Sequence, residues 1–245
     1  MRYIAAVANG GKLLTPQLLA SSLGRSLATG EATYQGRPQR IRWASTVVRP
    51  RIPIFVCAEG PRMLRLGGRI GDGVIAGTGL LPEVIQDTIA SIHAGAREAG
   101  RASSDLDIWF TARSSLHEDR EKAVENVKAS VSSILNHSMR FGLDGKHVPP
   151  DLRAKIQAYV DGYVLYEHVL HAGRNPARME ELGLTDYAIK RFALAGNARD
   201  WIARIEELAE AGATKLWVSV SGGTLDGQAH YMRILGEEVM ARFAS

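Results

Sequence analysis

Short apolar runs alternate along this chain with longer amphipathic segments. Four short runs carry mainly apolar side chains on both faces, near residues 53–58, 73–76, 107–112 and 215–220. A run without polar alternation is typical of a strand that is buried on both faces, as in a parallel sheet. The pattern therefore predicts four buried strands.

The segments between and after these runs have the spacing of amphipathic helices. Residues 82–100 carry apolar side chains at helical spacing, begin with proline and end with glycine, the usual asymmetry of a helix. Further helices are predicted for 61–71, for 117–139, for 226–243 and for the residues that follow an N-cap at Asn197. The inward residues of the helix at 61–71 are predicted to be Met63, Leu64 and Leu66.

Strands that alternate with helices indicate βα units and a parallel sheet, and hence an α/β fold. Four such units are legible, whereas a closed (β/α)₈ barrel needs eight and about 250 residues. Residues 142–191 form no further unit and are interpreted as a helical insertion. The residues alone leave two architectures open within a single domain over 1–245: an open sheet, or part of a barrel. Residues 1–20 are not assigned to this pattern.

Composition and charge exclude several classes of protein. Of the 245 residues 45% are hydrophobic and 23% are charged, and the net charge of +4 is spread without a polybasic run. We therefore expect no nucleic-acid partner and no membrane partner. The apolar runs fall short of the roughly 18 residues that a membrane span needs, and the first residues make a poor signal peptide. These features predict a cytoplasmic location, with the single Cys57 as a buried, inert thiol.

The stretch "AEGPR", residues 58–62, directly follows the first apolar run and carries the clearest candidate chemistry. Ligands of parallel α/β folds lie at the carboxyl ends of strands. Gly60 lets the backbone approach a ligand closely, and Pro61 fixes the turn into the helix. The helix N-terminus offers unpaired N–H groups to a phosphate, and Arg62 adds charge-assisted hydrogen bonds. The alternative is that the glycines here serve only as tight turns.

Several blocks of this sequence resemble one known family. The block "PIFVCAEGPRMLRLGGRIGDGVIAGTG" at 53–79 looks like the fifth and sixth strand region of the luciferase-like flavin-dependent oxidoreductases. The blocks at 106–127 and 193–220 resemble the seventh strand and the last helix–strand unit of that family, and 30–43 resembles the excursion before its fifth strand. The resemblance implies a (β/α)₈ TIM-barrel type of fold. It further implies that the chain corresponds to the C-terminal half of such a barrel, because family members run about 100 residues longer at the N-terminus.

The resemblance also implies a cofactor, FMN or a deazaflavin coenzyme, used for hydride transfer or oxygen insertion on a small-molecule substrate. It places the cofactor phosphate and ribityl region at Ala58, Glu59 and Gly60, and places Gly77, Thr78 and Gly79 in the same phosphate pocket. It assigns no catalytic residue. The alternative function is a non-catalytic half-barrel that acts only as a dimerising or partner-binding module. Open strand edges tend to pair, so a homo-oligomer is expected in either case.

Two further groups of residues in the insertion are candidates for chemistry. His168 and His171 stand three apart on a predicted helix, but the pattern is not HExxH and shows no third ligand, so no metal is predicted. Tyr159, Tyr163 and Tyr166 share helical spacing, which is more typical of packing than of a substrate lid.

Overall fold

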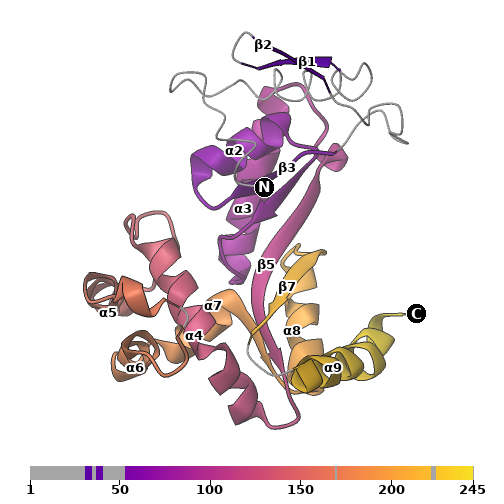
Figure 1. The fold of residues 1–245 in the computed structure, drawn as a ribbon. Helices are drawn as coiled ribbons and strands as arrows, with labels where there is room; N and C mark the ends of the chain where they lie inside the picture. Colours follow the sequence, from indigo (N-terminus) through magenta and orange to yellow (C-terminus); the bar gives the residue numbers. More distant parts are fainter. Residues whose placement is uncertain (1–30, 35–36, 41–52, 169, 222–224, 245) are drawn as a thin grey trace. The chain divides into compact units, whose positions relative to one another are not determined.

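The computed structural model describes residues 31–34, 37–40, 53–168, 170–221 and 225–244 (Figure 1). The chain forms two compact units. The first comprises Met1–Ile75 and Ser91–Asp107, and the second comprises Ala76–Ala90 and Ile108–Ser245. The unassigned segment 1–20 lies outside the described residues.

The first unit contains a hairpin and the first βα element. Strands β1 (Glu31–Tyr34) and β2 (Arg37–Arg40) pair antiparallel, and both lie within the block at 30–43. Strand β3 (Phe55–Ala58) is a neighbour of β4 (Gly73–Ala76) in the sheet, and helix α2 (Pro61–Ile70) connects the two. The strands predicted near 53–58 and 73–76 are therefore confirmed.

Glycines allow helix α2 to lie close to its neighbours. A Cβ atom on Gly67 would lie 2.8 Å from Cγ2 of Val74, and one on Gly68 would lie 1.9 Å from the backbone oxygen of Ile92 in α3 (Pro82–Glu98). The buried face of α2 therefore runs through Leu64, Gly67 and Gly68. The inward position predicted for Met63 is wrong: this side chain is exposed, because it is turned about 100° from Leu64 around the helix.

The second unit is built around β5 (Asp107–Leu116), whose first residue alone belongs to the first unit. Strand β7 (Leu216–Val220) pairs with β5 in parallel, and so does β6 (Ala193–Gly196). The parallel α/β architecture is therefore confirmed. Strand β6 is not among the four strands that the hydrophobic pattern predicts, because its run "ALAG" is short and rich in alanine.

A helical cluster packs around α4 (Arg120–Met139), as Figure 1 shows for α5 (Pro150–Asp161) and α6 (Arg174–Glu181). Helix α7 (Thr185–Phe192) completes the cluster and leads directly into β6. The residues of this core are Val127, Val131, Leu135, Met139, Leu143, Val148, Ile156, Tyr159, Met179, Leu184, Ala188, Phe192 and Ala193. The region 142–191 therefore shares one hydrophobic core with α4.

The helix after β6 is joined to β5 by a side-chain hydrogen bond. Helix α8 (Ala198–Glu210) begins at Asn197, which confirms the predicted N-cap, and Asp200 completes a reciprocal capping box. The indole N–H of Trp201 donates to the backbone oxygen of Ser115 at 3.2 Å. The predicted terminal helix is confirmed only for α9 (Leu225–Ile234); the chain continues as a π-helical turn, Leu235–Val239, and a 3₁₀ turn, Met240–Phe243.

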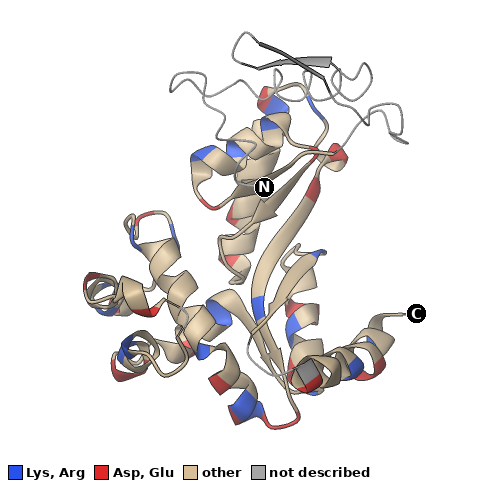
Figure 2. Cartoon of the chain, in the orientation of Figure 1, with Lys and Arg blue, Asp and Glu red and all other residues tan. Residues whose placement is uncertain are grey.

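Charged side chains of both signs are distributed over the helices of each unit (Figure 2). Among the described residues, no helix combines the length and apolar character that crossing a bilayer requires.

Cys57 is exposed, so its predicted burial is wrong. Side chains alternate across a strand, and Val56 packs toward Gly67 of α2, so Cys57 points to the other face of β3.

Candidate functional site

The end of β3 forms an open turn into α2. Ala58 is buried, whereas Glu59, Gly60, Pro61 and Arg62 are exposed. Gly60 is the N-cap with φ −92° and ψ 154°, which any residue can adopt, and its carbonyl accepts the amide of Leu64 at 2.9 Å. A Cβ atom on Gly60 would have no other atom within 4 Å. Neither the backbone conformation nor the packing of this turn therefore requires glycine.

The first turn of α2 suits an anion. Helix α2 has no side-chain cap, no acidic residue in its first turn, and a proline at its first position. Backbone N–H groups at such an end lack intrahelical partners and carry the positive end of the helix dipole. The open space at Gly60 and the uncapped first turn fit a phosphate group of a cofactor.

The end of β4 is built differently. Thr78 is half-buried and its hydroxyl lies 2.9 Å from that of Thr88, while Gly79 is buried with φ +115°. A Cβ on Gly79 would lie 2.9 Å from Cγ and 3.0 Å from the carbonyl oxygen of Arg191. This glycine is therefore required both by its backbone conformation and by the packing of Arg191.

The structure places the predicted residues at two turns, Ala58–Arg62 in the first unit and Gly77–Gly79 in the second. Sequence reasoning missed Arg191, which follows the helical pattern of α7 and is only 2% exposed. Burial lowers the pKa of its guanidinium, an effect that the neighbouring hydroxyl of Tyr187 partly offsets. The available signal was a basic residue directly before the apolar run "FALA", although basic residues are also common in the last turn of a helix.

The histidines and tyrosines of the insertion are not arranged as predicted. His168 and His171 do not lie on a helix, because α5 ends at Asp161 and only a 3₁₀ turn, Leu165–Glu167, precedes His168. The hydroxyl of Tyr163 lies 2.7 Å from Nδ1 of His168. Within the described ranges, no cluster of three or more His, Cys, Asp or Glu side chains is placed to hold a metal.

The three tyrosines also differ in exposure. Tyr159 is fully buried and its hydroxyl donates to the backbone oxygen of Ser132 at 2.7 Å, while Tyr166 is 97% exposed. The predicted helical alignment of the three is therefore wrong, because Gly162 ends α5 before Tyr163. Tyr159 has a packing role.

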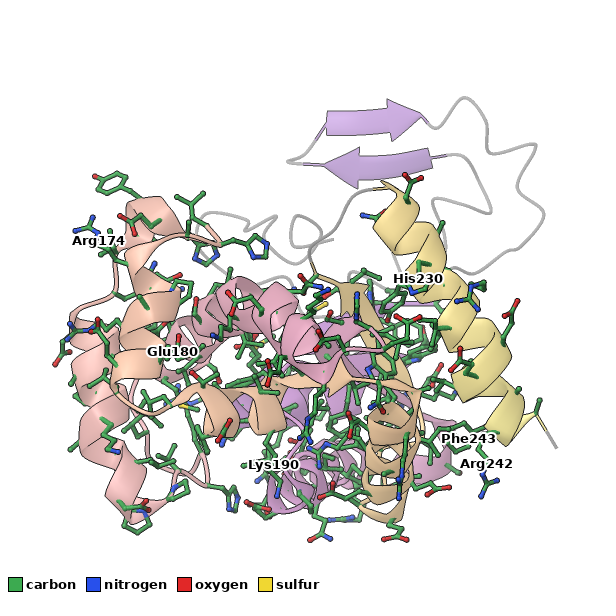
Figure 3. All side chains as sticks on the ribbon, turned by 90° about the horizontal axis from the view of Figure 1, so that it is seen from below. Arg174, Glu180, Lys190, His230, Arg242 and Phe243 are labelled. Atoms are coloured by element: carbon green, nitrogen blue, oxygen red, sulfur yellow. The ribbon has the colours of Figure 1, made fainter. Side chains whose placement is uncertain are left out.

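A cavity of about 410 Å³ lies between the start of α4, helices α7 and α8, and strand β6. Three basic and three acidic side chains line the cavity, so its walls carry no net charge. The guanidinium of Arg204 already donates to the backbone oxygens of Leu80 and Lys190 and to the carboxylate of Glu207. Figure 3 labels Lys190 on α7. None of the predicted cofactor residues lines this cavity.

Comparison with known proteins identifies the class. Residues 20–215 match the model of a family described as luciferase-like monooxygenase. The chain therefore belongs to the luciferase-like monooxygenase family, and the resemblance seen in the sequence is confirmed.

Individual relatives share part of this fold. A 5,10-methylenetetrahydromethanopterin reductase from Methanopyrus kandleri is 27% identical over 231 residues, which cover 89% of this chain and 59% of the reductase. An F420-dependent glucose-6-phosphate dehydrogenase from Nakamurella multipartita is 32% identical over 127 residues, covering 50% of this chain and 38% of the dehydrogenase.

A solved structure agrees with these relatives. It is the coenzyme F420 dependent tetrahydromethanopterin reductase from Methanopyrus kandleri, with a TM-score of 0.60 and 25% identity over 92% of this chain and 62% of that one. The luciferase-like barrel type of fold is thereby confirmed. The chain spans about 60% of the length of these reductases.

Proposed function

We propose that the chain forms the cofactor-phosphate-binding part of a deazaflavin-dependent oxidoreductase. The names of the similar reductase and dehydrogenase favour a coenzyme of the F420 type over FMN, and hydride transfer over oxygen insertion. The observation that carries the proposal is the turn at Gly60. It leaves open space where a Cβ would lie, directly before an uncapped helix N-terminus.

The residues of this turn have distinct roles in the proposal. The first-turn N–H groups of α2 and the guanidinium of Arg62 bind the phosphate. Glu59 accepts hydrogen bonds from hydroxyl groups of the ribityl chain, because a carboxylate beside a phosphate is electrostatically unfavourable. On the resemblance to the family, Gly77, Thr78 and Gly79 after β4 are included in the proposal as further cofactor-binding residues. When bound, the deazaflavin supplies the hydride transfer, and these residues hold and orient it.

The substrate in this proposal is a small molecule, and the protein acts as a homo-oligomer. Within the described part of the chain, β7 pairs with β5 alone, and its Trp217 and Val220 are 54% and 41% exposed. An open strand with exposed apolar side chains tends to associate. This observation also favours the second candidate, a half-barrel that dimerises without catalysing a reaction.

Titration of coenzyme F420 into the purified protein, followed by coenzyme fluorescence, tests the proposal. We expect Arg62→Ala to weaken binding about 10- to 150-fold, the loss of one charge-assisted hydrogen bond. Arg69→Ala removes a cation from the last turn of the same helix, about 10 Å away along its axis, and should leave the affinity unchanged.

Gly60→Val is a second probe of the same turn. Its side chain fits the open space and an ordinary φ, so the variant should fold normally but block close approach of the phosphate. Equal affinities in the wild type, Arg62→Ala and Gly60→Val would show that the phosphate binds elsewhere. A wild type that binds no coenzyme would favour the non-catalytic half-barrel.

A further inference from the structure

Arg191 is a buried cation whose hydrogen-bond acceptors are all neutral. Its Nη1 donates to the backbone oxygen of Lys146 at 2.7 Å and to the hydroxyl of Tyr187 at 2.9 Å, and its Nη2 donates to the backbone oxygen of Thr78 at 3.2 Å. Its Nε is buried and has no acceptor in the described part of the molecule. Burying a charge without a paired carboxylate is costly, so packing alone does not account for arginine here.

Both the side chain and the main chain of Arg191 hold the turn that ends β4. The guanidinium binds the carbonyl of Thr78, and the carbonyl of Arg191 accepts the amide of Leu80 at 2.6 Å. Between these two bonds, Cγ of Arg191 occupies the space that a side chain on Gly79 would need. The turn Thr78–Leu80 is therefore fixed at three successive residues by one arginine.

The same guanidinium joins this turn to the loop between α4 and α5. Its bond to the carbonyl of Lys146 lies next to His147, which has φ +52°, the one positive value among the described residues other than glycine. Nε2 of His147 lies 2.5 Å from the carboxylate of Asp87 in α3. The unusual backbone of this loop is thus held on one side by Arg191 and on the other by Asp87.

We infer that Arg191 is a positioning residue for cofactor binding. It fixes the Thr78–Leu80 turn against the Lys146–His147 loop, so that the end of β4 is preformed before the coenzyme arrives. This inference rests on the proposed function. A preformed turn avoids the entropy of ordering it on binding, so loosening the turn should weaken the coenzyme's affinity without removing any direct contact.

Amide hydrogen exchange of the cofactor-free protein tests the first part. Arg191→Gln removes the charge and most of the donors, and we expect exchange of the Leu80 and Lys146 amides to rise together by about tenfold or more. Arg178→Gln is the matched control. Arg178 also has a buried Nε without an acceptor and donates Nη2 to a backbone oxygen, that of Ala158. The Arg178→Gln variant should leave exchange at the Leu80 and Lys146 amides unchanged.

Gly79→Ala probes the same contact from the other side and keeps the inference testable if Arg191→Gln does not fold. It should raise exchange at the Leu80 amide as well. Unchanged exchange in the variants that fold would overturn the inference.

Coenzyme F420 titration of the same proteins tests the second part. We expect Arg191→Gln to bind about tenfold more weakly than the wild type, and Arg178→Gln to bind as the wild type does. Raised exchange with wild-type affinity would overturn the role in cofactor binding. A wild type that binds no coenzyme would refute the proposed function and, with it, the role of Arg191 in cofactor binding. The exchange data would still decide whether Arg191 holds the turn.

Discussion

The substitution Gly79→Ala should destabilise the protein markedly, for two separable reasons. Gly79 has φ +115°, a conformation that costs an alanine about 1–3 kcal/mol. The new methyl group would also lie 2.9 Å from Cγ and 3.0 Å from the carbonyl oxygen of Arg191, closer than carbon and oxygen atoms normally approach. Such overpacking typically costs another 1–3 kcal/mol or so, which gives a total of about 2–6 kcal/mol.

Gly142→Ala separates the two contributions. Gly142 has a similar φ of +100°, but a Cβ atom there would have no neighbour within 4 Å. We therefore expect this control to lose only the conformational part, about 1–3 kcal/mol. The difference between the two variants then measures the contact with Arg191.

The free energy of unfolding is measured by urea titration of the wild type and both variants, followed by circular dichroism. Gly79→Ala should unfold at a clearly lower urea concentration than Gly142→Ala. Equal losses of stability would show that the Gly79 turn does not pack against Arg191 as the structure shows, and would remove the physical basis of the positioning role.

Other predictions test the core, one ionisable group and one thiol. Leu135→Ala, in the core of the helical cluster, should lower the unfolding free energy by about 2–5 kcal/mol, whereas Leu165→Ala at a 67% exposed position should change it by less than about 0.5 kcal/mol in urea titrations. The pKa of Glu167 is lowered first by the backbone N–H of Arg174 and then by its side chain. Glu167 therefore stabilises the fold above the pKa of an unfolded glutamate, and this stabilisation is lost as the pH falls through the lowered value. Arg174→Ala should move the NMR titration midpoint only part of the way back, and a full return would contradict the backbone contribution. Cys57 should react with a thiol reagent in the native protein; protection until unfolding would contradict its exposure.

The sequence by itself predicted the elements whose stability is local or whose apolar runs are continuous. The strands of "IPIFVCA" and "KLWVSV" and the cap at Asn197 appear where the pattern placed them. A strand buried on both faces must be apolar along its length, and a capping box depends on residues only three apart. The composition of the "AEGPR" turn likewise predicted the break between β3 and α2.

Tertiary structure decided the features that depend on distant partners. Strand β6 has only the residues "ALAG", and it becomes a strand because β5 offers hydrogen bonds beside it. Cys57 is exposed because the opposite face of β3, which carries Val56, packs toward Gly67 of α2. None of these partners is adjacent in the sequence.

The buried position of Arg191 is the clearest case. Its acceptors lie on Thr78, Lys146 and Tyr187, and two of these three residues are more than 40 positions away. A charged side chain at the end of a helix normally reaches solvent, so the residue type predicts exposure. Only the folded chain brings these carbonyl and hydroxyl oxygens together around the guanidinium, which then holds the turn at the end of β4.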